Sequence, residues 1–284
     1  MIKVNGEIVN IEHFPDGTPR IYFDTDIVEE FKYKGSNYIQ IEWFYESDNE
    51  LFYLMLVKKH LERYFVDVNY ELYMPYIPNA RMDRTKHDKE VFTLKYFCDF
   101  INNLNFDSVF VLDAHSDVSV ALLNNCVNES PKEYVEKVIV DNLYNDISAG
   151  NLVLYFPDAG ASKKYSNMFP EFKYVYGNKV RTWETGEITG IEIVTPFDVN
   201  LTNKTILIID DIIAYGGSMY FGANKLKKLG VGKIYAYATH TENSVIEKGK
   251  SSLLKSLENG DIEKLFTTNS LFSGEHEKIE VIEL

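Results

Sequence analysis

The sequence predicts an α/β fold made of two similar domains, each with a mostly parallel sheet flanked by helices. Apolar runs of strand length alternate with longer amphipathic segments along most of the chain, and this alternation is typical of strands joined by helical crossovers. Several of the apolar runs end in acidic residues, where parallel strands commonly lead into a binding site. The length of 284 residues suits two medium-sized domains.

The first half alternates between expected strands and helices. Short strands are expected within residues 6–23, and the spacing of apolar residues predicts a helix over 49–63. The remaining elements are strands at 38–43, 70–75 and 108–113, and a helix at 89–104. Residues 124–132 are polar and include Pro131, so we expect the two domains to span residues 1–128 and 129–284.

The second half repeats this alternation. A helix is expected over 219–229, where Gly230 ends it. The expected strands lie at 152–156, 173–176, 190–194, 205–209 and 233–239. Their order predicts a second mostly parallel sheet, although the halves share no clean sequence repeat.

The composition excludes several classes of protein. A hydrophobic content of 45% is ample for a core, and a formal net charge of −14 argues against nucleic-acid binding. The two cysteines, Cys98 and Cys126, form no metal-ligand pattern and are expected to be reduced. The first residues are too polar for a signal peptide, and no stretch approaches the roughly 20 apolar residues of a membrane span. We therefore expect a cytoplasmic protein without membrane contact.

The segment 205–218 says most about function. Its apolar run ends in Asp210 and Asp211, and a short loop leads to Gly216 and Gly217. Two carboxylates at the end of a parallel strand suit ribose hydroxyls or hydrated Mg²⁺. The glycines let backbone N–H groups approach an anion, and the start of the next helix adds its dipole. The segment thus predicts a site for a phosphorylated ribose.

Two further strands end in acidic or imidazole side chains. Asp113, His115 and Asp117 would share one side if their strand continued, and such groups can hold a divalent ion. The alternative is a histidine satisfied by neighbouring acids. Asp158 follows the next apolar strand and is either a metal ligand or the N-cap of a helix.

Two loops carry pairs of cations. Arg81 and Arg84 follow a strand and suit a phosphate or a nucleobase plane. Lys179 and Arg181 alternate within the polar loop 178–187, which could close over a polyphosphate during transfer. Solvated turns are the alternative in both places.

Taken together, seven blocks resemble the ribose-phosphate diphosphokinases, also called phosphoribosyl pyrophosphate synthetases. The blocks occur in the order of that family and cover roughly residues 10–245. They are Phe14-Pro-Asp-Gly17, Asn79-Ala-Arg-Met-Asp-Arg84, Asp113-Ala-His115, Pro157-Asp-Ala-Gly160, Lys179-Val-Arg181, Asp210-Asp211 with Gly216-Gly217-Ser218, and Ala236-Tyr-Ala-Thr-His240. The resemblance implies two domains of phosphoribosyltransferase type, Mg²⁺ as cofactor and a homo-oligomer. It also implies transfer of the β,γ-diphosphate of ATP to the anomeric hydroxyl of ribose 5-phosphate, giving phosphoribosyl pyrophosphate and AMP.

The resemblance also implies roles for individual residues. Residues on the ATP side, two of which would reach the site of a neighbouring subunit, are Phe14, Asp16, Arg81 and Asp83. The metal would be held by His115, Asp158 and Asp113. The transition state would be stabilised by Lys179 and Arg181. The ribose and its phosphate would be bound by Asp210, Asp211, Ala214, Tyr215, Gly216, Gly217 and Ser218.

The chain departs from the family pattern at four positions. Met82 replaces a glutamine, Thr18 a glutamate, and Ala214 and Tyr215 an Asp-Thr pair beside the sugar phosphate. The last change is either neutral or marks another acceptor, because a tyrosine ring can stack on a base and alanine removes a charge that would repel a second phosphate. ADP-ribose, as in NAD salvage, is therefore an alternative acceptor. A phosphoribosyltransferase and a non-catalytic regulatory homologue are further alternatives. The chain ends soon after Glu280, so the last helix of the family is expected to be missing.

Overall fold

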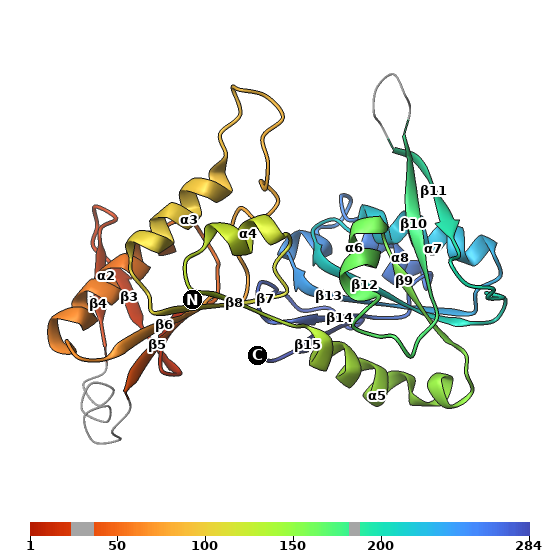
Figure 1. Ribbon diagram of the computed structural model, residues 1–284, viewed down its shortest axis with the longest axis horizontal. Coiled ribbons are helices and arrows are strands. Elements are labelled where there is room, and N and C mark those ends of the chain that lie inside the picture. The colour runs from red at the N-terminus through yellow and green to blue at the C-terminus, as the bar shows by residue number, and fades with distance from the viewer. Residues whose placement is uncertain (24–36, 182–187) are drawn as a thin grey trace. The chain divides into compact units, whose positions relative to one another are not determined.

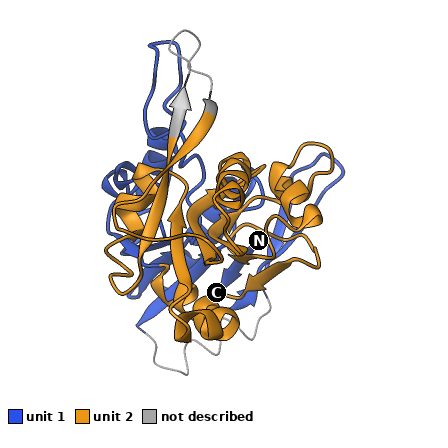
Figure 2. Ribbon diagram, turned by 90° about the vertical axis from the view of Figure 1, so that its right-hand side faces the viewer, with its two compact units in different colours: residues 1–130 blue, residues 131–284 orange. Residues whose placement is uncertain are grey.

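The computed structural model describes residues 1–23, 37–181 and 188–284 (Figure 1), without the side chains of residues 179–181 and 188–189. Two compact units make up the chain, Met1–Ser130 and Pro131–Leu284 (Figure 2). Each contains a mostly parallel sheet flanked by helices, so the predicted fold class is confirmed. In the described ranges, no helix combines the length and apolar character needed to cross a membrane.

Unit 1 has a six-stranded sheet in the order β2-β1-β5-β6-β7-β8. The strands β5 to β8 run parallel, whereas β1 is antiparallel to both of its neighbours. These strands are β1 (Ile2–Val4), β2 (Glu7–Ile8), β5 (Tyr38–Trp43), β6 (Asn69–Tyr73), β7 (Ser108–Leu112) and β8 (Cys126–Glu129). A separate hairpin consists of β3 (Asn10–His13) and β4 (Pro19–Tyr22). The helices are α2 (Glu50–Tyr64), α3 (Thr93–Asn103) and α4 (Asp117–Leu122).

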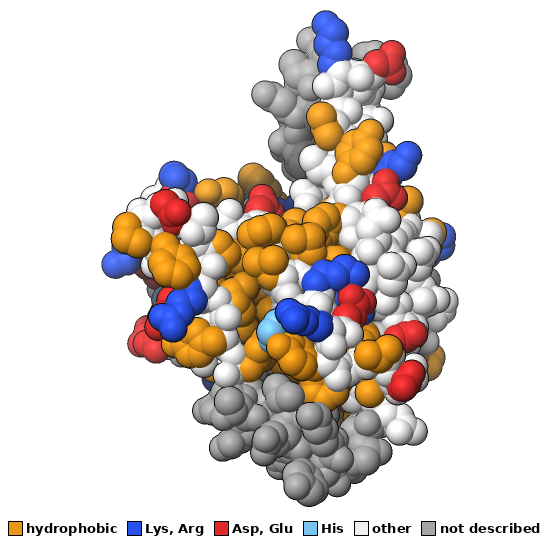
Figure 3. Space-filling model, turned by 90° about the vertical axis from the view of Figure 1, so that its left-hand side faces the viewer, with side chains coloured by type: hydrophobic (Ala, Val, Ile, Leu, Met, Phe, Trp, Pro, Cys, Tyr) orange, Lys and Arg blue, Asp and Glu red, His pale blue; other side chains and the backbone are white. Residues whose placement is uncertain are grey.

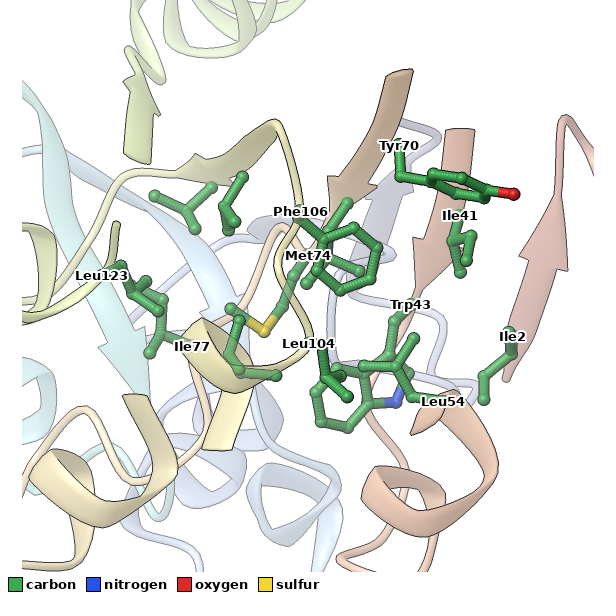
Figure 4. Close-up of a cluster of buried hydrophobic side chains, with 14 of the residues drawn as sticks. Ile2, Ile41, Trp43, Leu54, Tyr70, Met74, Ile77, Leu104, Phe106 and Leu123 are labelled. Carbon is green, nitrogen blue, oxygen red and sulfur yellow. The ribbon is translucent and has the colours of Figure 1, made fainter. Parts of the chain in front are cut away.

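The core of unit 1 packs helices α2 and α3 against the sheet (Figure 4). Trp43 is fully buried at the end of β5, and its indole N–H donates to Glu50 Oε2 at 3.0 Å. The same oxygen accepts from the backbone N–H of Glu46 at 2.8 Å. Glu50 also binds the ammonium group of Met1. These donors satisfy the buried carboxylate, which ties the sheet to the first turn of α2.

Lys58 is a buried cation on α2. Its Nζ lies 2.6 Å from Glu62 Oε1 and 3.9 Å from the centre of the Tyr70 ring. Glu62 also accepts from Lys59 Nζ at 2.8 Å. A buried charge is tolerated when it has such partners. The Glu62 carboxylate therefore balances the positive charge of Lys58, which helix α2 directs into the core.

Unit 2 has a seven-stranded sheet in the order β11-β10-β9-β12-β13-β14-β15. All neighbours are parallel except β10 and β11. The strands are β9 (Leu152–Phe156), β10 (Tyr174–Arg181), β11 (Ile188–Val194), β12 (Thr205–Ile213), β13 (Lys233–Thr241), β14 (Leu265–Thr268) and β15 (Ile279–Ile282). The helices are α5 (Lys132–Ser148), α6 (Ala159–Tyr165), α7 (Gly217–Lys228) and α8 (Ser252–Asn259), with a short 3₁₀ turn, η1 (Asn243–Ile246).

Helices cover both faces of the second sheet. Ile206 and Ile208 of β12 pack in the cluster that includes residues of α7 and α8. Leu207 and Ile209 pack in the cluster that includes residues of α5 and α6. This alternation explains why β12 reads as a continuous apolar run, since a parallel strand covered on both faces must be apolar at every position.

Several element boundaries differ from those expected. The polar segment 124–132, where we expect the domain boundary, contains β8 and the first residue of α5, and β8 was not expected because it is an edge strand with little apolar sequence. The expected boundary after residue 128 thus falls within β8. Strand β12 runs past residue 209 to Ile213, and β10 runs past 176 to Arg181. Pairing with neighbouring strands carries both beyond their apolar runs.

The Tyr155 side chain fills a slot between two glycines. A Cβ atom at Gly222 of α7 would lie 2.6 Å from the Tyr155 hydroxyl and 2.6 Å from an edge carbon of its ring. A Cβ atom at Gly177 of β10 would also lie 2.6 Å from that hydroxyl. Only glycine permits these close approaches.

Gly222→Ala should destabilise unit 2, although alanine favours a helix interior over glycine by about 1 kcal/mol. Overpacking a core with one methyl group costs about 1–3 kcal/mol, and here the group would meet a fully buried ring. Urea unfolding measures the loss. Gly217→Ala is the matched control in the same helix, because its Cβ meets no described atom within 4 Å. Equal stability of the two variants would contradict the slot.

The pH dependence of stability should change in Glu62→Gln. Burial alone would raise the pKa of the Glu62 carboxyl, but the hydrogen bonds from Lys58 and Lys59 lower it below its ordinary value of 4.5. The ionised carboxylate therefore stabilises the folded chain above that value and loses this contribution as the pH falls below it. Urea midpoints of the two proteins should converge between about pH 6 and about pH 3.

Glu7→Gln provides the control for this titration. Glu7 is exposed on β2, so the difference in urea midpoint between Glu7→Gln and wild type should stay constant across the same pH range. A constant difference for Glu62→Gln as well would show that the lysine pair does not act on Glu62.

Candidate active site

The carboxyl ends of β9 and β12 meet at one edge of the unit 2 sheet, because the two strands are neighbours and run parallel. Asp158 follows β9, and Asp210 and Asp211 lie near the end of β12. The predicted paired acids are thus inside the strand rather than at its tip. Because successive strand residues point to opposite faces, Asp210 follows Ile208 toward the α7 face, and Asp211 follows Ile209 toward the α6 face.

Asp211 is held by its neighbours on the α6 face. Its Oδ1 accepts from the backbone N–H of Ile212 at 2.8 Å, and its Oδ2 lies 3.5 Å from Lys164 Nζ. Both side chains are mostly buried. Lys164 was not among the predicted site residues. The sequence shows two adjacent lysines, Lys163 and Lys164, shortly after Asp158. Only the orientation of helix α6 about its axis shows which of them faces β12.

Asp158 is the N-cap of α6. Its Oδ1 accepts from the backbone N–H of Ala161 at 3.0 Å. The structure therefore places it in the capping position that the sequence left as an alternative. One carboxylate oxygen is used in this way, and the residue lies at the same sheet edge as Asp210 and Asp211.

The loop 214–216 is fixed by the start of α8. The carbonyl oxygen of Tyr215 accepts from the backbone N–H groups of Ser252 at 2.9 Å and Leu253 at 3.1 Å. Gly216 adopts a left-handed conformation with φ 71°, and a Cβ there would lie 2.3 Å from Leu253 Cβ. Only glycine fits this position, so the loop has one backbone path into helix α7.

Helix α7 presents its first turn beside this loop. Gly216 is the N-cap and has no side chain to accept from the first N–H groups. The N–H groups of Gly217 and Ser218 at a helix start suit an anion, which the helix dipole also favours.

The ring of Tyr215 stands at the rim of the same loop. It is 42% exposed, and its hydroxyl lies 3.1 Å from Glu247 Oε2. The hydrogen bonds from Lys250 and then from Tyr215 lower the pKa of Glu247, so that carboxylate is charged at neutral pH and fixes the outer end of the ring. Ala214, its neighbour, is half-buried.

In unit 1, the predicted shared face of Asp113, His115 and Asp117 is wrong. Strand β7 ends at Leu112, and Asp113 has a left-handed backbone with φ 50°. Asp113 is buried at 1% exposure, whereas His115 and Asp117 are exposed. The turn is anchored to β8, because the backbone N–H of Ala114 donates to Asn128 Oδ1 at 3.0 Å.

The residues predicted on the ATP side lie in two turns of unit 1. Phe14 is 52% exposed in the turn of the β3–β4 hairpin. Asp16 accepts from the hydroxyl of Thr18 at 2.7 Å and from its backbone N–H at 3.0 Å, and these hydrogen bonds lower the pKa of Asp16. The family departure Thr18 therefore orients Asp16.

In the second turn, Arg81 is exposed. Asp83 binds the guanidinium of Arg84 through both oxygens, at 2.9 and 3.2 Å. The pair keeps Asp83 close to the turn.

The predicted cationic loop begins later than expected. The backbone of Lys179 and Arg181 belongs to β10, paired with Ile191 and Ile188 of β11. The side chains of Lys179 and Arg181, and residues 182–187, lie outside the described part of the chain. Their predicted role is neither supported nor opposed by the geometry.

The donors at the unit 2 edge fit a hard cation. Mg²⁺ prefers oxygen ligands and keeps several waters, so one or two carboxylates are enough for it. Asp158 and Asp210 supply such oxygens at one sheet edge. Within residues 1–23, 37–181 and 188–284, no three His, Cys, Asp or Glu side chains gather into a group that could hold a metal by themselves.

His240 is a core residue rather than a site residue. It lies at the end of β13, is almost fully buried, and its Nδ1 is 2.8 Å from Ser270 Oγ. The two form part of a buried polar cluster with Thr268.

Comparisons with known proteins place the chain among relatives. No protein-family model matches it. It is 27% identical over 237 residues to a ribose-phosphate pyrophosphokinase from Thermococcus kodakarensis, covering 82% of this chain and 77% of that protein. It is 25% identical over 280 residues to one from Listeria ivanovii, covering 96% of this chain and 80% of that protein.

The fold agrees with these sequence matches. A phosphoribosylpyrophosphate synthetase from Mycobacterium smegmatis superposes with a TM-score of 0.74 over 97% of this chain and 86% of the other, at 16% identity. The resemblance inferred from the seven sequence blocks is thereby confirmed. Over most of its length, the chain is therefore similar in sequence to ribose-phosphate pyrophosphokinases, at 25–27% identity to these two relatives.

Proposed function

We propose that the protein is a Mg²⁺-dependent ribose-phosphate diphosphokinase, which transfers the β,γ-diphosphate of ATP to ribose 5-phosphate and releases AMP. The observation that carries the proposal is the unit 2 sheet edge, where Asp210 lies near the carboxyl end of β12 and the glycine loop leads into helix α7. Sugar hydroxyls and a phosphate are the groups that suit a carboxylate beside such a helix start. A cytoplasmic location accompanies this proposal.

On the sugar side, the two acids have different surroundings. Asp211 is nearly buried and close to Lys164, so it holds α6 against β12. Asp210 is half-buried and lies on the face of the glycine loop, so it is the direct ligand of the ribose hydroxyls. The N–H groups of Gly217 and Ser218 bind the 5-phosphate.

The reaction needs positioning and charge neutralisation more than a protein nucleophile. The anomeric oxygen attacks the β-phosphorus, the bond from that phosphorus to the oxygen of AMP breaks, and the hydroxyl proton is released. Lys179 and Arg181 neutralise the charge that develops on the phosphoryl oxygens. Mg²⁺ bound by Asp158 in unit 2, or by His115 in unit 1, would supply further neutralisation. Asp113 is too deeply buried for a hydrated ion.

On the ATP side, Arg81 binds the nucleotide, and Asp83 orients the turn through Arg84. Phe14 and Asp16 complete the site of a neighbouring subunit in a homo-oligomer. Unit 1 exposes several large apolar side chains that an oligomer could cover, among them Phe14, Tyr22, Tyr38, Phe52 and Tyr64. Figure 3 shows hydrophobic side chains gathered on one face, bordered by charged ones.

A second candidate function has the same chemistry with ADP-ribose as acceptor. The exposed ring of Tyr215, held by Glu247, favours it, because the ring belongs to the loop that leads into the proposed phosphate site. An adenine could stack on that ring.

An AMP-release assay tests both candidates. With ATP and Mg²⁺, the protein should form AMP with ribose 5-phosphate, and chelation of Mg²⁺ should abolish the reaction. AMP formation with ATP and ADP-ribose, but not with ATP and ribose 5-phosphate, would replace the first candidate by the second. Absence of AMP with either acceptor would contradict the diphosphokinase function and favour a phosphoribosyltransferase or a non-catalytic homologue.

Lys179→Ala should lower kcat by about 10²–10³-fold, the usual effect of removing one donor to a developing charge. Single-turnover AMP formation measures it. Lys233→Ala, at the opposite end of the sheet on the first residue of β13, is the matched control and should keep wild-type activity. A fully active Lys179→Ala would remove this lysine from the mechanism.

A further inference from the structure

Tyr155 of β9 carries a buried hydroxyl that the proposed mechanism does not use. The side chain is 0% exposed. Among the residues that the structure describes, no hydrogen-bond partner reaches its hydroxyl oxygen. A buried hydroxyl without a partner is costly and rare in native proteins, so the group calls for a physical explanation.

Packing alone does not explain this tyrosine. The slot around its hydroxyl is kept open by Gly222 and Gly177, each of which would place a Cβ atom 2.6 Å from the oxygen. Glycine within a helix such as α7 is unfavourable. Phenylalanine would fill the same core without a polar atom, yet the chain combines a tyrosine with two glycines that make room for its outer end.

The strand register places this hydroxyl near the sugar site. Tyr155 pairs with Ile208 of β12 and with Val175 of β10. Asp210 and Gly177 are two residues further along these strands, on the same face of the sheet. Since the hydroxyl approaches Gly177, the ring leans toward the carboxyl ends of the strands, where Asp210 lies on the neighbouring strand.

The electrostatic surroundings keep the proton on this oxygen. Burial, and then the negative charges of Asp210 and Asp158, raise the pKa of Tyr155. The hydroxyl therefore stays a donor at neutral pH, and it faces an edge rich in acceptors.

We propose that Tyr155 is a positioning residue of the sugar site: when a ribose-type acceptor binds, the Tyr155 hydroxyl donates to the Asp210 carboxylate and orients it for the hydroxyls of the acceptor. This inference rests on the proposed function, since it assigns Asp210 to the acceptor. It makes Tyr155 a determinant of acceptor affinity rather than a group in contact with the reacting phosphorus.

Tyr155→Phe tests the inference, because it removes the hydroxyl and keeps the ring in the slot. KM for ribose 5-phosphate should rise about ten- to a hundredfold, as expected for losing one hydrogen bond to a charged group, while KM for ATP and kcat stay near wild type. The melting temperature should stay equal or rise, since no partner in the folded chain is lost. Unchanged KM for the acceptor would overturn the proposal.

Tyr70→Phe is the matched control. Tyr70 is also buried, but its hydroxyl donates to the carbonyl oxygen of Phe65 at 3.0 Å in unit 1. This variant should lower the melting temperature and leave KM for the acceptor unchanged. A Tyr155→Phe variant that behaves like Tyr70→Phe would make Tyr155 a structural residue only.

Calorimetric titration with ribose 5-phosphate separates this inference from the proposed function. If wild type binds the sugar phosphate but forms no AMP, the proposed reaction fails, and an affinity of Tyr155→Phe that is about ten- to a hundredfold weaker still supports the positioning role. If both proteins bind it equally, or if neither binds it, the positioning role is overturned.

Discussion

The parallel pairing of β9 with β12 is the constraint on which the unit 2 site depends. Their shared direction places the residues that follow both apolar runs at one sheet edge. For this reason Asp158 lies at the same edge as Asp210 and the turn into α7, although it is far from both in the sequence. The close contact of Lys164 with Asp211 then holds α6 on the adjacent strand. A slip of one residue in this pairing would turn Asp210 to the opposite face.

How far the sequence predicts the fold depends on how each element is stabilised. The strands β5 and β9 begin and end where expected, because uninterrupted apolar runs between polar segments define them. Strand β12 is longer than its apolar run, since hydrogen bonds to β13 carry it through two acids that a pattern would read as its end. At Asp113 the error is the reverse: a left-handed backbone stops a strand that alternation would extend.

The site was predictable where short blocks carry the chemistry, as in the acids and glycines of 210–218. Lys164 and Tyr155 could not be found in this way. The role of Lys164 depends on the rotation of α6, and the environment of Tyr155 depends on Gly177 and Gly222, which are distant in sequence. Thr18 illustrates a third case, since its replacement of a family residue gains meaning only from its hydrogen bonds to Asp16.

The loop at Tyr215 has a consequence for how this protein can diverge. Its carbonyl oxygen serves the first N–H groups of α8, and Gly216 touches Leu253 of the same helix. An insertion or deletion there would uncap α8 as well as reshape the loop, so two structures constrain its length at once. The side chain at 215 points outward and bears no such burden. Lineages that exchange one acceptor for another should therefore vary by substitution at this position while the chain around it keeps a constant number of residues.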